Sequence, residues 1–68
     1  MKTYHNIRVK SAHKLFARDV FTNEKETIHL SAGEMIIGRI DMINGNNWLT
    51  LEDGRGAVVD KGFFEVLD

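Results

Sequence analysis

Two tight-turn signals lie close together in this chain, an Asn-Gly pair at residues 44–45 and an Asp-Gly pair at residues 53–54. Such pairs are typical of β-hairpins, because these residues tolerate the positive φ angles that tight turns require. In the run between them, residues 48–52, two leucines alternate with other side chains. Since neighbouring side chains of a strand point to opposite faces, the leucines are expected in the core and Trp48 outside. The pattern predicts antiparallel β-structure with the only tryptophan on its outer surface.

Other segments show the same alternation, and together they predict five or six short strands. Ile7 and Val9 share one face of the first segment, and Ile28 and Leu30 share one face of another. Gly38 lies in the middle of a longer apolar segment, where it would permit a bulge or a kink. The predicted strands cover residues 4–10, 27–30, 34–43, 48–52, 57–59 and 64–67.

Residues 11–22 are compatible with three structures. Leu15 and Phe16 fit the apolar face of a short helix that follows a Ser11 N-cap. Leu15 and Ala17 fit the alternation of a strand equally well, and a long folded-back loop is the third alternative.

The fold that these patterns favour is a small all-β barrel that includes residues 1–68 as a single domain. No proline, repeat or low-complexity tract divides the chain. Short strands separated by glycine-containing turns are typical of small barrels, in which closure removes exposed strand edges. A chain of this size buries only about 60% of its unfolded surface. Since the chain has no cysteine and no Cys/His ligand set, no disulfide, metal or cofactor is expected. A domain this small must then be stabilised by a compact barrel or by association, so a monomer or a small homo-oligomer is expected.

The composition also bears on location. The apolar runs are far shorter than the roughly 20 residues that span a bilayer, and the N-terminus lacks the apolar core of a signal peptide. A soluble protein without a membrane partner is therefore expected. The absence of cysteine favours a cytoplasmic location.

Charge is distributed unevenly along the chain. Residues 1–22 carry five basic side chains against Asp19 alone, whereas residues 23–68 carry four basic and nine acidic ones, which gives a net charge of −1. Such a basic segment either contacts nucleic-acid phosphates or neutralises the acidic body on which it packs, and the second role is favoured in so short a chain. The basic residues concerned are Lys2, Arg8, Lys10, Lys14 and Arg18.

Four segments, in a fixed order, resemble Src-homology-3 (SH3) domains. Residues 26–34 resemble the segment before the diverging turn, 44–48 the loop ending in the ligand-stacking tryptophan, 54–58 the distal return strand, and 63–67 the closing segment. The resemblance implies an SH3-like barrel in which Trp48 contacts the partner. Residues 15–19 replace the tyrosine motif of the family and Val59 replaces its proline, which argues against proline-rich helices as ligands. Bacterial and phage proteins use the same barrel for other partners, and the chain resembles that group.

A second resemblance, to Sm-like proteins including the bacterial Hfq type, implies a ring that binds RNA. The spacing of the first Sm-like motif is matched by Leu30, Gly33, Gly38 and Ile40, and its end by residues 49–53. However, Asn44 and Trp48 occupy the positions of the RNA-contacting aspartate and asparagine of that motif. The acidic body also opposes binding to phosphate.

The expected site is an exposed aromatic patch centred on Trp48. Aromatic side chains are enriched in the hot spots of binding surfaces. Phe63 and Phe64 are adjacent, so if Phe64 shares the core face with Val66, Phe63 extends the patch. The expected aromatic members are Trp48, Phe63, Phe16 and Phe21, and the expected charged rim is Glu24, Glu26 and Arg55.

No pattern in the chain indicates catalysis. The two serines have no neighbouring base motif, and a domain this small has little room to desolvate a carboxylate and raise its pKa. His5, His13 and His29 lack a recognised metal-ligand spacing. The sequence therefore predicts a non-enzymatic protein-binding module, an adaptor or small inhibitor of phage or prophage type. The alternative is a nucleic-acid-binding protein, either Sm-like or acting through its basic arm.

Overall fold

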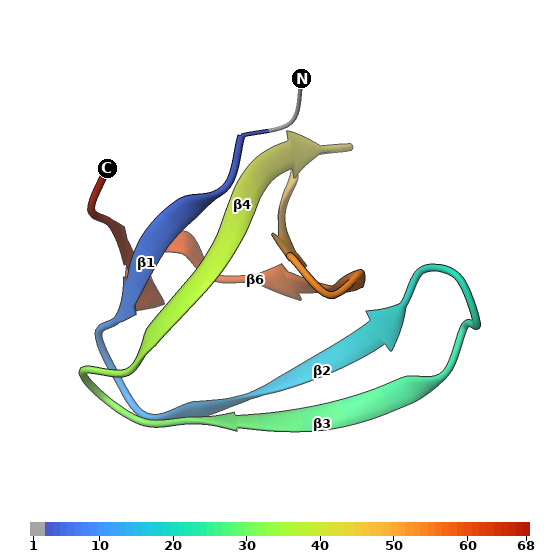
Figure 1. Cartoon of the computed structure of the whole chain (residues 1–68), viewed down its shortest axis with the longest axis horizontal. Coiled ribbons are helices and arrows are strands. Elements are labelled where there is room, and N and C mark those ends of the chain that lie inside the picture. Colours follow the sequence, from blue (N-terminus) through green and yellow to red (C-terminus); the bar gives the residue numbers. More distant parts are fainter. Residues whose placement is uncertain (1–2) are drawn as a thin grey trace.

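Antiparallel strands form nearly the whole molecule (Figure 1). The computed structural model describes residues 3–68, and these residues contain seven strands and one 3₁₀ helix. The elements are β1 (His5–Val9), β2 (His13–Asp19), β3 (Lys25–Leu30), β4 (Met35–Ile43), β5 (Asn46–Leu51), β6 (Arg55–Val59), η1 (Lys61–Phe63) and β7 (Phe64–Val66). The all-β class predicted from the sequence is confirmed. The predicted number of five or six strands is too low. The additional strand is β2, which lies in the segment that was compatible with three structures.

The strands form one open sheet in the order β3-β2-β6-β5-β4-β1-β7, with β3 and β7 at its edges. The longest strand, β4, changes partner in its middle: residues 35–38 pair with β1, and residues 38–43 pair with β5. A Cβ on Gly38 would lie 2.8 Å from the carbonyl oxygen of Thr50. Both ladders keep their register through Gly38, so of the bulge or kink that this glycine would permit, the bulge is not formed. The absence of a Cβ instead lets β5 pack closely where β4 changes partner.

The strand β2 follows the alternation of apolar residues rather than the helical pattern. Leu15 and Ala17 are buried, whereas Phe16 between them is 78% exposed. All six residues from 13 to 18 pair with β3, and this cross-strand pairing selects the strand over the helix.

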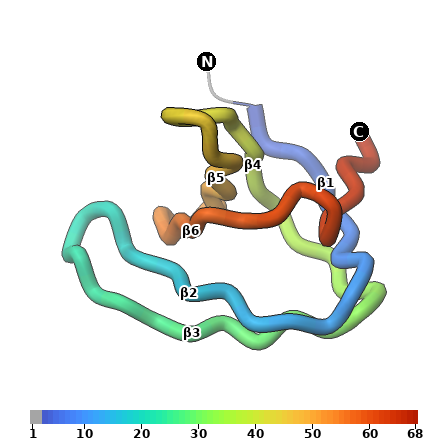
Figure 2. The backbone as a smooth tube through the Cα atoms, turned by 180° about the vertical axis from the view of Figure 1, so that it is seen from behind, coloured from blue at the N-terminus to red at the C-terminus, as the bar shows by residue number. Residues whose placement is uncertain are grey.

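The hairpin formed by β2 and β3 pairs with the rest of the sheet at one end only. Residues 18–19 pair with residues 55–56 of β6, and from there the hairpin diverges, as Figure 2 shows. At the other end of β2, the ring of His13 stacks on Phe63 with a centroid distance of 4.6 Å. The middle of β2 is thus left without a strand partner on the side of β6.

The core consists of alternate side chains from six of the seven strands. The buried apolar residues are Ile7, Val9, Leu15, Ala17, Leu30, Leu49, Ala57, Val59 and Phe64, with Ile28, Ile36, Ile40 and Leu51 packed against them. The predicted inward positions of Ile7, Val9, Leu49 and Phe64 are confirmed. Val66 pairs with Ile7 but remains 45% exposed, because it lies near the end of the edge strand β7.

The one helical element in the described part of the chain is η1, which spans three residues. Its N-cap is Asp60, whose carboxylate accepts a hydrogen bond from the Gly62 N–H at 2.9 Å. Residues 3–68 contain no helix with the length and apolar character needed to cross a membrane.

Candidate binding groove

Trp48 projects from β5 on the face opposite the core. In the ladders it lies between Asp41 of β4 and Val58 of β6. Its neighbour Leu49 is 1% exposed and points inward, as strand alternation requires. The β4–β5 turn just before it is formed by residues 44–45, both at positive φ, as in a tight two-residue hairpin. The turn and the register together fix the position of the indole.

The indole of Trp48 lies over Gly56. A Cβ added to Gly56 would lie 2.4 Å from Cζ2, 2.7 Å from Cε2 and 2.8 Å from Nε1 of the indole. These distances are far below van der Waals contact, so only glycine at this position lets the ring lie against the sheet. Trp48 is consequently half-buried, with the backbone of β6 as its support.

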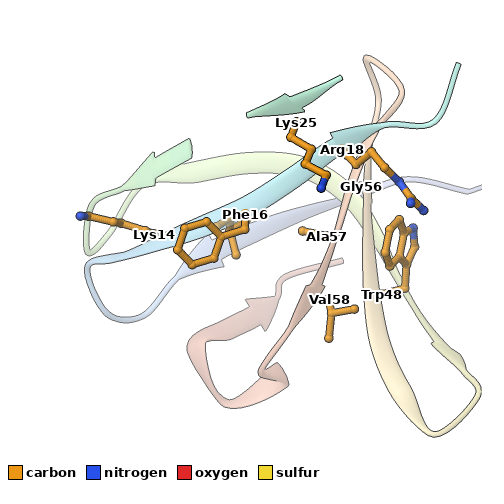
Figure 3. Close-up of a pocket in the computed structure, with 9 residues that line it drawn as sticks. Lys14, Phe16, Arg18, Lys25, Trp48, Gly56, Ala57 and Val58 are labelled. Carbon is orange, nitrogen blue, oxygen red and sulfur yellow. The ribbon is translucent and has the colours of Figure 1, made fainter. Parts of the chain in front are cut away.

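Beside Trp48, an open groove runs between β2 and β6 (Figure 3). Its volume is about 590 Å³, within the range of roughly 300–1,000 Å³ that is usual for binding clefts. The apolar walls are Phe16, Trp48 and Val58, of which Phe16 is 78% and Val58 59% exposed. A smaller groove of about 320 Å³ adjoins Trp48 and is lined by Arg18, Ile43, Asn44, Asn46, Trp48 and Val58.

Three cationic side chains surround the apolar walls: Lys14, Arg18 and Lys25. Lys14 and Arg18 flank Phe16 on the exposed face of β2, and Lys25 of β3 is the cross-strand partner of Arg18. Within residues 3–68, none of the three forms an ion pair. In Figure 3, Arg18 reaches toward Trp48, and Lys14 extends away beyond Phe16.

Of the predicted aromatic patch, the structure brings together Trp48 and Phe16 only. Phe63 stacks on His13 and does not line the groove. Phe21, which is 85% exposed, lies at the tip of the β2–β3 hairpin, where its ring is next to Gly54. The patch is therefore formed by β2, β5 and β6, without the residues that precede β7.

The predicted charged rim of Glu24, Glu26 and Arg55 lies away from the groove. Arg55 Nη1 donates to Glu26 Oε2 at 2.9 Å, and Arg55 Nη2 lies 2.7 Å from Asp53 Oδ2. The hydrogen bond from the Arg55 side chain lowers the pKa of Asp53, and the same bond raises the pKa of Arg55. Glu24 lies in the exposed turn that precedes β3. The ion pairs of Arg55 stabilise the β5–β6 turn and its contact with β3, while the rim of the groove is basic.

The predicted basic residues are divided among several parts of the fold. Lys2 lies outside the described residues. Arg8 is paired with Glu65 of β7, and Lys10 is exposed between β1 and β2. The remaining two, Lys14 and Arg18, line the groove.

The histidines are separated from one another. The Nδ1 of His13 lies 2.6 Å from the carbonyl oxygen of Ser11, and its buried Nε2 has no hydrogen-bond partner within residues 3–68. His5 Nδ1 lies 3.8 Å from Asp68 Oδ1, and His29 is on the edge strand β3. The described residues contain no group of three or more side chains that could hold a metal ion.

Five residues that line the groove were not predicted to belong to it: Leu15, Lys25, Gly56, Ala57 and Val58. The register of the β2–β3 hairpin places Lys25 beside Arg18, and that hairpin was not recognised in the sequence. Gly56 and Val58 lie on the outer face of β6, where Trp48 covers Gly56, and their alternation with Ala57 on the core face was the available signal.

Comparison with known proteins gives no match: the chain fits no protein-family model, and no curated protein and no solved structure is significantly similar to it.

Proposed function

We propose that this chain is a non-enzymatic protein-binding module, an adaptor or a small inhibitor, which binds its partner in the groove between β2 and β6. The observation that carries the proposal is the support of Trp48 by Gly56, next to the exposed Phe16 and Val58. An aromatic side chain that is already held in place loses little conformational entropy when a partner covers it. Such residues are the usual hot spots of protein interfaces.

We further propose that the domain is an SH3-like barrel. The support comes from the order of its elements: a long β2–β3 hairpin, then β4, β5 and β6 joined by tight turns, and a 3₁₀ turn before the last strand. The first strand, β1, pairs with both β4 and β7. In the SH3 resemblance, the tryptophan after the β4–β5 turn is the ligand-stacking residue, which agrees with the place of Trp48 in the groove.

Binding is favoured over catalysis by the electrostatics of the described residues. No polar or charged residue among them is buried, whereas a catalytic acid or base usually requires a desolvated position. The shifted pKa values of Asp53 and Arg55 are explained by the hydrogen bonds that these two side chains make with each other at an exposed turn.

The experiment is parallel affinity capture with the native chain and Trp48→Ala as baits, followed by titration of the purified captured protein. We expect Trp48→Ala to weaken binding by about 2 kcal/mol or more, which is roughly 30-fold. Phe21→Ala removes an exposed aromatic side chain outside the groove and should bind like the native chain.

Circular dichroism must show that Trp48→Ala remains folded. Should it unfold, Phe16→Ala and Val58→Ala test the same groove, because both side chains are mainly exposed. Unchanged affinity in all the folded groove variants would contradict the proposal.

A second candidate function is binding of single-stranded nucleic acid. The observation that favours it is the combination of Phe16 and Trp48 with three cations in one groove, since stacking platforms next to positive charge bind such strands. The net charge of −1 and the small number of cations weigh against it.

An Sm-like ring that binds RNA is a different nucleic-acid hypothesis. Light scattering in solution tests it, because a monomer would exclude a ring.

A further inference from the structure

The cations of the groove differ from the other cations of the sheet. Arg8, Arg39 and Arg55 are paired with carboxylates of this chain. Within residues 3–68, the cations without an ion pair are Lys10, Lys14, Arg18, Lys25 and Lys61, and three of these five gather around one groove. The groove is therefore locally positive, although the net charge of the whole chain is −1.

A partner that covers the groove removes water from these cations. If the partner is neutral, the lost hydration is not replaced, and each cation then opposes binding. A partner with carboxylates placed against the cations offsets this cost and is attracted before contact. Charge complementarity thus selects an anionic partner.

The spacing of the groove residues fits an extended chain. Lys14, Phe16 and Arg18 are alternate residues of one strand, so their side chains leave the sheet at intervals of roughly 7 Å. Alternate side chains of an extended peptide have the same spacing. Lys25, opposite Arg18, doubles the positive charge at the end near Trp48. The apolar walls lie between the two charged ends.

We infer that the groove binds an extended acidic segment of a partner protein. Its carboxylates face Lys14 at one end and the Arg18–Lys25 pair at the other, and an apolar side chain enters between Phe16, Trp48 and Val58. The inference rests on the proposed function, because it specifies the partner of the same groove.

An acidic peptide fits the groove better than a nucleic-acid strand does. One side of the Trp48 indole lies against Gly56, so only its other side is open to stacking, and beside Phe16 the apolar walls include the exposed aliphatic Val58, which offers a base no aromatic face. Three cations can neutralise a few carboxylates, whereas a nucleic-acid strand extends its negative charge along the acidic remainder of the domain.

The test uses three arrays of short synthetic peptides, each with one apolar residue at a varied position. The other positions are aspartate or glutamate in the first array, serine in the second and lysine in the third, and oligothymidylate is the nucleic-acid probe. We expect the acidic array to bind best. The tightest acidic peptide, titrated by fluorescence anisotropy, should bind at least about tenfold more tightly than its serine counterpart.

Charge-reversal variants then assign the binding to the groove. Lys14→Glu, Arg18→Glu and Lys25→Glu should each weaken the acidic peptide about fivefold or more. The matched controls Lys10→Glu and Lys61→Glu change the net charge equally but lie outside the groove, so they should retain most of the affinity. Equal losses in the controls would show that overall charge is responsible, which overturns the inference.

The outcomes separate the inference from the proposed function. If serine peptides bind as tightly as acidic ones and still require Trp48, the acidic partner is wrong and the protein-binding function stands. If oligothymidylate alone binds, with the same dependence on the three cations, the partner is nucleic acid and both fail. If no probe binds in a Trp48-dependent way at millimolar concentration, the inference fails, and affinity capture with the groove variants decides the proposed function separately.

Discussion

The indole of Trp48 covers Gly56, although the direct ladder partner of Trp48 is Val58. Gly56 is the diagonal neighbour, two residues earlier on β6 and on the same face of the sheet. Because a Cβ at this position would lie 2.4 Å from the ring, the wall that Trp48 forms depends on Gly56 having no side chain. A side chain at position 56 should displace the indole, and removal of the indole should make a side chain at position 56 tolerable.

Gly56→Ala is expected to destabilise the domain by about 1–3 kcal/mol, because the indole must rotate away from a methyl group that has no room. The free energy of unfolding is measured by urea titration. Tryptophan fluorescence should shift toward the red, since the displaced ring becomes more exposed to water.

A double-mutant cycle identifies the cause of this loss. In a Trp48→Ala background the colliding ring is gone, so adding Gly56→Ala should cost less than about 0.5 kcal/mol. An equal cost in both backgrounds would mean that Gly56 is needed for its backbone and not for the tryptophan.

Leu49→Ala is expected to cost about 2–5 kcal/mol, because Leu49 is 1% exposed and its removal leaves a cavity in the core. A loss of this size is a large part of the total stability of so small a domain. Urea unfolding followed by circular dichroism measures it. The matched control is Leu67→Ala, which removes the same atoms from a side chain that is 47% exposed and should change stability by less than about 0.5 kcal/mol.

Most of the fold could be predicted where strand alternation and turn chemistry agree. The tight turn before Trp48 and the inward Leu49 follow from neighbouring residues alone. Residues 13–19 could not be assigned, because their apolar spacing suits a helix as well as a strand. Only the pairing with β3, which is not a local property, decides between the two.

The candidate site was predictable in its centre and only in part in its rim, where Lys14 and Arg18 were named for the alternative of nucleic-acid binding and Lys25 was not named. Trp48 and Phe16 were identified as aromatic surface residues, and both line the groove. Phe63 was expected there because its neighbour Phe64 points inward, but the ring of His13 stacks on Phe63 instead. Lys25 joins the groove only through the register of the β2–β3 hairpin. Contacts between distant segments thus determined what the pattern of a single segment did not.

Glu26→Gln is expected to destabilise the domain by about 0.2–1 kcal/mol at low salt, the usual range for an exposed ion pair. Glu26 of β3 binds Arg55 of β6 across the intervening strand β2, so the pair fixes the diverging hairpin to the sheet. Urea unfolding at low salt and in about 1 M salt should show the difference from the native chain shrinking as the ions screen the pair. Glu24→Gln is the control, since Glu24 has no ion pair within residues 3–68, and a salt-independent effect of Glu26→Gln would argue against the ion pair as its cause.

Asp53→Asn is expected to remove a pH-dependent part of the stability. Asp53 Oδ2 accepts the Arg55 Nε–H at 2.8 Å and Oδ1 accepts the Arg55 backbone N–H at 3.0 Å, and these two hydrogen bonds lower the pKa of Asp53 from its ordinary value of 3.8. Above pH 3.8 the carboxylate is ionised in both states, and its interactions stabilise the folded one. As the pH falls below 3.8, the unfolded chain takes up the proton first, so the stabilisation is lost as the pH passes through the lower pKa of the folded state.

Urea unfolding between about pH 6 and pH 2 measures the free energy of unfolding of the native chain and of the Asp53→Asn variant. The difference between the two should be constant at the upper end of this range and decline at the lower end. A difference for Asp53→Asn that grows on acidification would contradict the lowered pKa of Asp53.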